Sequence, residues 1–405
     1  MSARLPQHRF IFITLVAITF ISPLANHMFI PAMPLVKQEF QIGDELAFAT
    51  LSLTMMTMAF TSIVYGGISD EWGRKRVLLS GLALYTIGAE ICWFAPNIEM
   101  LLGGRMLQGA GAGCGIVLAR AIARDVYGME KISAVIANLT AAYVLGPLLA
   151  PVIGSYLVGW EGWRFLFIPI SVIGLVLIGI VYFGLPETHA PVREKPPFSV
   201  IVRNILRNYF QLLKVPRFAA YALMPGCLSG VFFANAAASA FLAIETLGIS
   251  TRDFGHWFLW MPAGFMLGNL ISGQIGNRLS IGMMTIGGAS LCLLIVAFQW
   301  FWNATAGLSI GGIMIPGAML GIAQGMCMPY AQTGAMRVNP ALAGSASGAV
   351  VFSQLFLAGA AEQSVGFLSD GTLIPVLYVM FGFSCVALTA AIFAEISRAR
   401  NEPAA

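Results

Sequence analysis

Charged side chains are scarce in this sequence. Only 10% of its 405 residues are Asp, Glu, Lys or Arg, whereas 58% are hydrophobic. A soluble domain devotes about a quarter of its residues to the charged side chains that cover its surface. The shortage therefore excludes an ordinary soluble protein and indicates that lipid surrounds most of the chain.

The residues and motifs of common catalytic sites are also missing. The six cysteines are spread singly through apolar runs, which excludes a disulfide framework or a cysteine metal site. The sequence has no HExxH motif, no GxxxxGK[ST] loop and no nucleophile constellation. We therefore expect no cofactor, no metal and no enzymatic activity. The absence of a basic patch with interleaved aromatic residues argues against nucleic acid, and the lack of a sizeable soluble domain argues against a membrane sensor.

Long uncharged runs are what the chain has instead. No Asp, Glu, Lys or Arg occurs in residues 133–159, 218–244, 254–277 or 279–336. Roughly 20 apolar residues in a helix cross a lipid core, and continuous apolar runs exclude a barrel. The predicted fold class is an all-α membrane protein of twelve transmembrane helices. The predicted spans are 10–33, 46–69, 77–97, 98–121, 132–158, 163–186, 217–245, 254–277, 279–302, 305–328, 344–368 and 372–395.

The basic residues predict the orientation of these spans. An N-terminus inside places 18 of the 22 Lys and Arg residues on the cytoplasmic side. The other four are Lys37, Arg105, Arg164 and Arg252. We expect a multi-pass protein of the bacterial inner membrane with both termini in the cytoplasm.

One long polar stretch divides the chain into six spans and six spans. It predicts an N-terminal six-helix bundle over residues 1–186, a cytoplasmic linker over 187–216 and a C-terminal six-helix bundle over 217–405. Two equal sets of spans suggest bundles related by a parallel repeat, as in many secondary transporters.

The most specific motif lies between the second and third predicted spans, at residues 66–76, which read GGISDEWGRKR. Gly66 allows close helix approach, Gly73 permits a sharp turn, and the basic cluster that begins at Arg74 keeps the loop inside. Asp70 is a carboxylate at the membrane edge that needs a partner. The alternative is an ordinary positive-inside loop, which the full Gly, Asp, Gly, Arg and Lys pattern makes the poorer interpretation.

This loop resembles the characteristic loop of the major facilitator superfamily. Residues 104–113, 121–125, 146–154 and 185–188 are similar to motifs of its drug:proton antiporters with twelve spans, of the bicyclomycin/chloramphenicol-resistance type. The resemblance implies the major facilitator fold, with a central substrate site opened alternately to each side of the membrane.

The resemblance also implies roles for the loop residues. Asp70 and Arg74 would latch the cytoplasmic side, with Asp70 at the start of the eleventh span and Arg74 paired with Asp125. Helix N-termini favour carboxylates, which supports the first contact. The open alternative for Asp125 is a solvated charge at a helix end.

The fifth span resembles a variant of the family's antiporter helix. Pro147 and Pro151 each remove a backbone donor and kink the helix, and Gly146 and Gly154 allow close packing beside them. A tight, leak-resistant seam is predicted. The alternative is ordinary tolerance of proline within a membrane helix.

Five ionisable residues lie at membrane depth, where such groups are functional candidates: His27, Glu90, Arg105, Glu245 and Glu362. Helical rise predicts that Glu90 and Arg105 lie at one level on adjacent antiparallel helices, where matching faces would allow a salt bridge. We assign transport and proton coupling to Arg105, His27 and Glu362. His27 stands where the resembled family usually has an acidic residue, and its unperturbed pKa near ~6.5 still permits switching. The alternative for His27 is an interfacial histidine. For Glu90 a structural role is favoured, and for Glu245 a solvated charge at the edge of a loop.

Polar residues in the spans are candidates for lining a central cavity, namely Gln108, Tyr143, Asn235 and Gln324. Each of these side chains, taken alone, more often forms a hydrogen bond between two helices.

By resemblance, the chain is a monomeric secondary transporter whose partners are the lipid bilayer, protons and a small-molecule substrate. Proton-coupled efflux of small amphipathic compounds is the favoured function. Export of an endogenous metabolite such as a siderophore, and uptake, are the alternatives.

Overall fold

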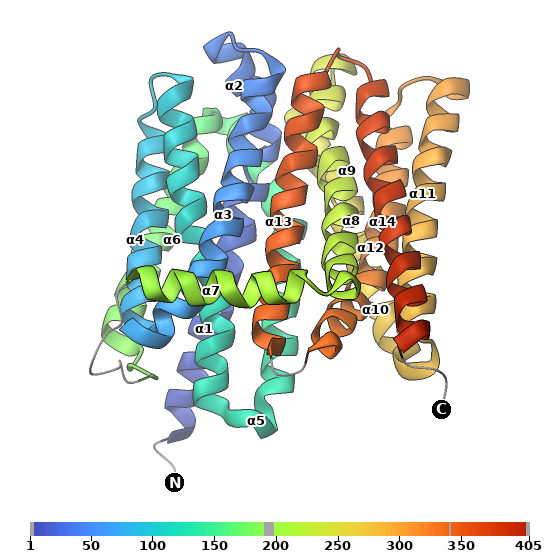
Figure 1. Ribbon diagram of the computed structural model, residues 1–405. Coiled ribbons are helices and arrows are strands. Elements are labelled where there is room, and N and C mark those ends of the chain that lie inside the picture. Colours follow the sequence, from blue (N-terminus) through green and yellow to red (C-terminus); the bar gives the residue numbers. More distant parts are fainter. Residues whose placement is uncertain (1–3, 190–197, 340–341, 402–405) are drawn as a thin grey trace. The chain divides into compact units, whose positions relative to one another are not determined.

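The computed structural model describes residues 4–189, 198–339 and 342–401, and every element in these ranges is a helix (Figure 1). The helices form two compact units. Unit 1 comprises Met1–Ala32 and Leu53–Ile205, and unit 2 comprises Met33–Ser52 and Leu206–Ala405. The all-α fold class is confirmed, whereas the domain boundaries at residues 186 and 217 stay a prediction.

Unit 1 is built around α5, which contacts both α1 and α4, while α4 also contacts α6 (Figure 1). Glycines bring α4 and α5 together: a Cβ atom on Gly111 would lie 2.2 Å from the backbone nitrogen of Tyr85. Its elements are α1 (Arg4–His27), η1 (Ile30–Ala32), the end of α3 (Asp44–Trp72), α4 (Arg74–Trp93), α5 (Ile98–Glu161), η2 (Trp163–Leu166) and α6 (Phe167–Gly184).

Helix α5 contains two predicted spans in one 64-residue element. Gly128 divides them, because its φ of 67° and ψ of 176° are not helical. Glycine lacks the Cβ atom that makes such a backbone conformation costly for other residues. The fourth and fifth predicted spans are therefore the two halves of α5.

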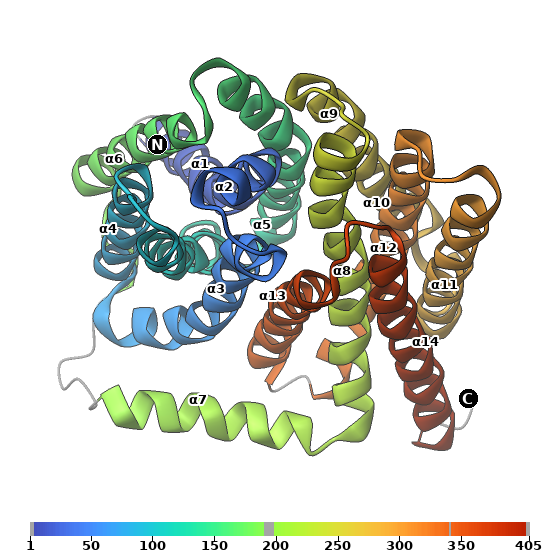
Figure 2. The same ribbon diagram turned by 90° about the horizontal axis from the view of Figure 1, so that it is seen from above.

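Unit 2 is built around α8, which contacts α12, α13 and α14, with α13 and α14 on its two sides (Figure 2). Its elements are α2 (Met33–Phe40), the start of α3, the end of α7 (Phe198–Leu213), α8 (Pro216–Phe241), η3 (Leu242–Thr246), α9 (Thr251–Phe258), α10 (Trp260–Ile275), η4 (Gly276–Arg278), α11 (Ile281–Ala306), α12 (Ile310–Val338), α13 (Ala343–Leu368) and α14 (Ile374–Asn401).

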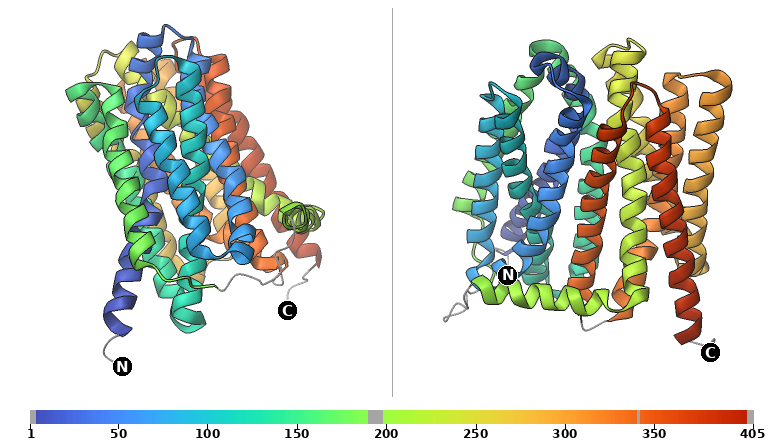
Figure 3. Two further views of the ribbon diagram at one scale, coloured as in Figure 1. Left: turned by 90° about the vertical axis from the view of Figure 1, so that its left-hand side faces the viewer. Right: turned by 45° about the horizontal axis from the view of Figure 1, so that its top comes forward.

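Ten helices within the described ranges are long and apolar enough to cross a membrane. The other two predicted spans also lie on helices. Residues 132–158 belong to the second half of α5, and residues 254–277 are divided between α9 and α10. The predicted linker contains α7, which lies across the direction of α8 and α14 (Figure 3).

Candidate transport site

A fully buried cation lies at the contact of α1 and α5. Arg105 has an exposed fraction of 0%. Its Nη1 donates to Gln108 Oε1 at 2.6 Å and to the Ala25 carbonyl at 3.2 Å, and its Nη2 donates to Asn26 Oδ1 at 3.3 Å. The guanidinium carbon lies 4.6 Å from the centroid of the Phe29 ring. These five residues form what we call the Arg105 cluster.

The end of α1 explains why acceptors are available to Arg105. Helix α1 ends at His27, and the backbone N–H of Phe29 donates to the Asn26 carbonyl. The Ala25 carbonyl therefore receives no intrahelical bond from Phe29, as is usual in the last turn of a helix. That carbonyl accepts from Arg105 instead.

Burying a cation in a membrane protein is expensive unless hydrogen bonds and an aromatic face compensate for lost water. Arg105 has both kinds of contact, and its fork of donors suits several acceptors at once. Such a group can hold the polar part of a bound compound within an otherwise apolar surrounding.

A salt bridge between Glu90 and Arg105, which matching helix faces would have allowed, is not among the ion pairs of the described residues. Glu90 is half-buried on α4, and Arg105 bonds to neutral oxygen atoms of α1 and α5 instead. Equal depth, which helical rise predicts, does not determine which face of each helix carries the side chain. The structure therefore favours Gln108 over Glu90 as the partner of Arg105.

The other two proton-coupling candidates are also buried. His27 is 4% exposed, and its Nδ1–H donates to the Pro23 carbonyl at 2.7 Å. Glu362 is 1% exposed on α13. His27 directly follows Asn26 of the Arg105 cluster, whereas Glu362 belongs to unit 2. Their roles in coupling stay predictions.

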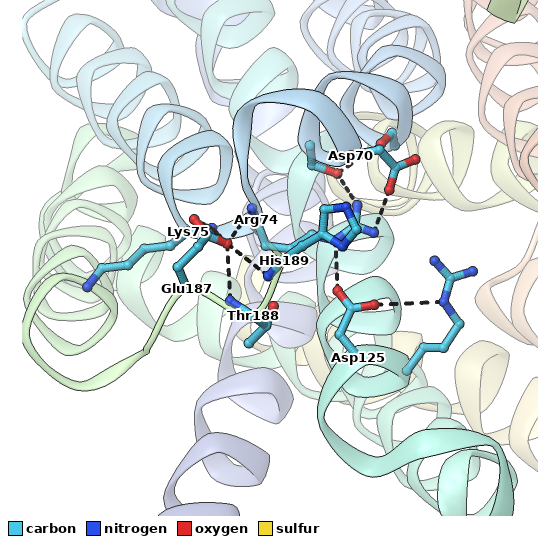
Figure 4. A network of polar contacts seen from close by, with 10 residues as sticks. Asp70, Arg74, Lys75, Asp125, Glu187, Thr188 and His189 are labelled. Atoms are coloured by element: carbon cyan, nitrogen blue, oxygen red, sulfur yellow. Dashed lines mark hydrogen bonds and ion pairs between the residues drawn. The ribbon is translucent and has the colours of Figure 1, made fainter. Parts of the chain in front are cut away.

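The motif at residues 66–76, which spans the end of α3 and the start of α4, takes part in a compact ionic network in unit 1 (Figure 4). Arg74 is 2% exposed, and its Nε donates to Asp125 Oδ2 at 3.0 Å, as predicted. Its Nη2 pairs with Asp70 Oδ1 at 2.5 Å, and its Nη1 donates to Ser69 Oγ at 2.5 Å. The expected contact of Asp70 with the start of the eleventh span stays a prediction.

Glu187 joins the same network, and its part was not predicted. Its Oε1 accepts the backbone N–H of Arg74 at 2.8 Å, and its Oε2 accepts that of Lys75 at 3.2 Å (Figure 4). These are first-turn donors of α4, which have no partner within the helix. Gly73, with a φ of 93°, lets the carboxylate approach, because a Cβ atom there would lie 2.5 Å from Glu187 Oε2. The Leu-Pro-Glu-Thr ending at residues 185–188 was the available signal.

The antiporter-helix residues lie on the second half of α5, where it packs closely against α1. A Cβ atom on Gly146 would lie 2.4 Å from Pro23 Cγ, and one on Gly154 would lie 2.3 Å from the Met28 carbonyl oxygen. Pro147 and Pro151 lie between these two glycines inside the helix. Close packing at both glycines agrees with the predicted seam, while its leak resistance stays a prediction.

The predicted cavity residues fall in different units. Gln108 belongs to the Arg105 cluster, and Tyr143 is half-buried on the second half of α5. In unit 2, Asn235 Oδ1 accepts from Gln299 at 3.1 Å, and Gln324 donates to Ser229 Oγ at 3.0 Å. Both are helix–helix hydrogen bonds, which was the alternative reading for each residue.

A second ionic network lies in unit 2 and was not predicted. Lys37 Nζ lies 2.7 Å from Asp44 Oδ1 and 2.8 Å from Glu245 Oε2. Sequence reasoning favoured a solvated Glu245, but its side chain is paired although 36% exposed. The ring of Phe48 stacks on that of Phe241 nearby in the fold, with centroids 4.9 Å apart.

Comparison with known proteins identifies the family of this helical scaffold. The profile of the Major Facilitator Superfamily matches residues 15–362. The chain belongs to the Major Facilitator Superfamily. It is therefore a membrane transporter and not an enzyme.

Within the superfamily, the chain is similar to proteins named for resistance to drugs. A bicyclomycin resistance protein homolog of Haemophilus influenzae is 25% identical over 390 residues, covering 94% of each chain. Multidrug resistance protein D of Escherichia coli is 28% identical over 345 residues, covering 83% of each chain. The predicted resemblance to the bicyclomycin-resistance type is confirmed.

Solved structures share the fold at low sequence identity. A bacterial homolog of the human lysosomal transporter Spinster superposes with a TM-score of 0.72 at 15% identity, covering 97% of this chain and 96% of that chain. A D-xylose–proton symporter superposes with a TM-score of 0.68 at 14% identity, covering 95% and 96%. The twelve-helix major facilitator fold is thereby confirmed.

Proposed function

We propose that this protein exports small amphipathic compounds in exchange for protons. The observation that carries the proposal is the Arg105 cluster, a buried cation with neutral hydrogen-bond acceptors and an aromatic face at membrane depth. Such a group suits recognition of a compound with one polar part and a large apolar part. The similarity to the bicyclomycin and multidrug resistance proteins supports the same substrate class.

In the proposed mechanism, Arg105 holds the polar part of the compound, and Gln108 and Asn26 position its guanidinium. His27 and Glu362 are assigned to carry the proton, because both are ionisable side chains buried at membrane depth. The ionic network of Asp70, Arg74 and Asp125 steadies one side of the transporter while the other is open. Substrate and proton then exchange as the two bundles alternate in access.

We place the protein in the bacterial inner membrane as a monomer with both termini in the cytoplasm. The supporting observation is the distribution of Lys and Arg, 18 of 22 of which fall on one side of the predicted spans. Labelling of cysteines introduced at Lys195 and at Arg252 in intact cells tests this orientation. Position 252 should react with an impermeant reagent, and position 195 should react only after the membrane is opened.

Everted membrane vesicles with an imposed pH gradient test the exchange. Addition of a transported compound should release protons from the vesicle lumen, and Arg105→Ala should abolish that release by removing the buried cation. Ala297→Ser, on the exposed face of α11, is a matched control that should behave like the wild type. Absence of proton release with a broad panel of amphipathic compounds contradicts the proposal.

The same vesicles distinguish the alternative functions. Export of an endogenous metabolite would give proton release with that metabolite and not with the broad panel. Uptake by proton symport would move protons across the membrane in the same direction as the compound. His27→Ala separates binding from coupling, because it should preserve binding of the compound and slow only the proton-coupled step.

A further inference from the structure

A groove with apolar walls runs between α8 and α14 in unit 2, and its volume is about 430 Å³. Figures 2 and 3 show these two helices side by side. Residues Pro216, Ala219 and Leu223 form the wall on α8, and Val386, Ala390 and Phe393 form the wall on α14. We call this the α8–α14 groove.

The sequence explains both the floor and the rims of the groove. Ala219 and Ala390 are too short to fill the space between the helices, whereas Leu223 and Phe393 extend beside it and are 39% and 48% exposed. In a bilayer, such a space is open to lipid tails, which are as apolar as the walls. Pro216 and Leu223 are seven residues apart, so the groove extends ~10 Å along α8 from its first residue.

Basic residues gather at the end of the groove where α8 begins. Lys214 is exposed, and its ammonium lies 4.7 Å from the centroid of the Phe210 ring. The guanidinium carbon of Arg217 lies 6.0 Å from the centroid of the Tyr221 ring. Glu395 on α14 is bonded to Arg398, with Arg398 Nε 3.0 Å from Glu395 Oε2.

The charge at this end is therefore positive. Arg217 lies over the ring of Tyr221 on α8, while Glu395 and Arg398 come two and five residues after the groove residue Phe393 on α14. With Lys214, three cations accompany one carboxylate, and that carboxylate is already bonded to Arg398. The arrangement complements an anion that arrives with an apolar tail.

Helix α7 indicates that this end lies at the level of the lipid headgroups. Leu206, Phe210 and Leu213 are 61%, 62% and 55% exposed and recur at helical spacing. Arg203 and Arg207 are exposed on the same helix. An exposed apolar stripe flanked by basic residues is typical of a helix in the membrane interface, where the apolar face enters the acyl boundary.

We propose that the α8–α14 groove binds one anionic phospholipid, with an acyl chain between the walls and the phosphate at Lys214 and Arg217. The apolar walls exclude a polar metabolite, and the cations favour a negatively charged headgroup over a zwitterionic one. A helix from a second copy of this chain is the competing occupant, and the experiment below distinguishes it.

Native mass spectrometry of the full-length protein in detergent measures the binding directly. The probe is phosphatidylglycerol, compared with phosphatidylcholine of the same acyl chains. The double variant Lys214→Ala/Arg217→Ala should weaken phosphatidylglycerol binding about thirty-fold, because each cation near a membrane surface contributes about 1 kcal/mol. Arg76→Ala, which removes an exposed basic residue from unit 1, is the control and should bind like the wild type.

Filling the groove with a larger side chain tests, independently of charge, whether an acyl chain binds between the walls. Ala219→Trp should abolish the specifically bound lipid of either headgroup, and Ala297→Trp on the exposed face of α11 should not. Thr389→Trp is a second filling variant, on the exposed part of the α14 wall, for use if Ala219→Trp does not fold.

Two results would overturn the proposal. The first is equal phosphatidylglycerol binding by the wild type, the double variant and a folded filling variant. The second is a wild-type dimer that either filling variant converts to a monomer without any change in bound lipid. The conservative pair Lys214→Arg/Arg217→Lys should retain binding, which separates charge from local packing.

Discussion

The guanidinium of Arg74 is held between two carboxylates, with its Nε 3.0 Å from Asp125 Oδ2 and its Nη2 2.5 Å from Asp70 Oδ1. Arg74 is the first residue of α4, and Asp125 lies near the end of the first half of α5. The pair therefore connects two helix ends that are 51 residues apart. Because Arg74 is buried, loss of either carboxylate leaves its charge poorly compensated.

Asp125→Asn is expected to destabilise the protein by about 1–3 kcal/mol, because it replaces the charged acceptor of the buried Arg74 guanidinium with a neutral one. Asp70 remains to compensate for part of the charge, so the chain should still fold. Thermal unfolding in detergent measures the effect as a lower melting temperature. Glu71→Gln, in the last turn of α3, is the control, since no ion pair or hydrogen bond of its side chain occurs in the described structure. Equal melting temperatures for both variants would contradict the assigned pairing.

Glu187→Ala is expected to loosen the first turn of α4. The carboxylate satisfies the backbone donors of Arg74 and Lys75, a contribution comparable to a helix cap of ~1 kcal/mol. Hydrogen exchange should therefore become faster at these two amides and remain unchanged near the middle of α4. Glu187→Gln, which retains one acceptor oxygen, should fall between the wild type and the alanine variant. Unchanged exchange in Glu187→Ala would show that the cap is dispensable.

Gly154→Ala is expected to disturb the close contact of α5 with Met28, the residue that follows α1. The new Cβ atom would lie 2.3 Å from the Met28 carbonyl oxygen, and overpacking of this kind costs about 1–3 kcal/mol. Gly179→Ala on α6 is a matched control, because a Cβ atom there meets nothing within 4 Å. Melting temperature and passive proton leak through proteoliposomes measure the two consequences. A normal melting temperature with no proton leak in Gly154→Ala would contradict the predicted seam.

The span-by-span architecture could be predicted because hydrophobic length is a property of sequence alone. Each predicted span lies on a helix, including the two separated by Gly128, whose non-helical backbone permits the change of direction. The Arg74–Asp125 pair was also predictable, because both residues belong to a motif at helix ends. In these cases the signal is local or comes from a known pattern.

The partner of Arg105 could not be predicted from depth. Helical rise places Glu90 at the right level, but the rotation of α4 about its axis is set by packing glycines such as Gly88. A Cβ atom on Gly88 would lie 2.4 Å from the backbone nitrogen of Gln108, so the face that meets α5 is the glycine face. Glu90 is two residues further along the helix and therefore projects from a different face.

The Lys37 network was missed for a related reason, since Lys37 and Glu245 are 208 residues apart and no motif connects them. Lys37→Met removes the cation that Asp44 and Glu245 share, so these carboxylates should repel each other. All three side chains are partly exposed, and the pairs should therefore be weak.

A double-mutant cycle with Lys37→Met and Glu245→Gln should give a coupling energy of about 0.2–1 kcal/mol from melting in detergent at low salt. Raising the salt concentration to about 1 M should reduce the coupling, because screening then extends over only ~3 Å. Ionic attraction between exposed groups is the only contact of the pair that salt weakens in this way. A coupling energy that is zero at low salt, or one that salt leaves unchanged, would mean that Phe48 and Phe241, rather than the charges, hold this part of unit 2 together.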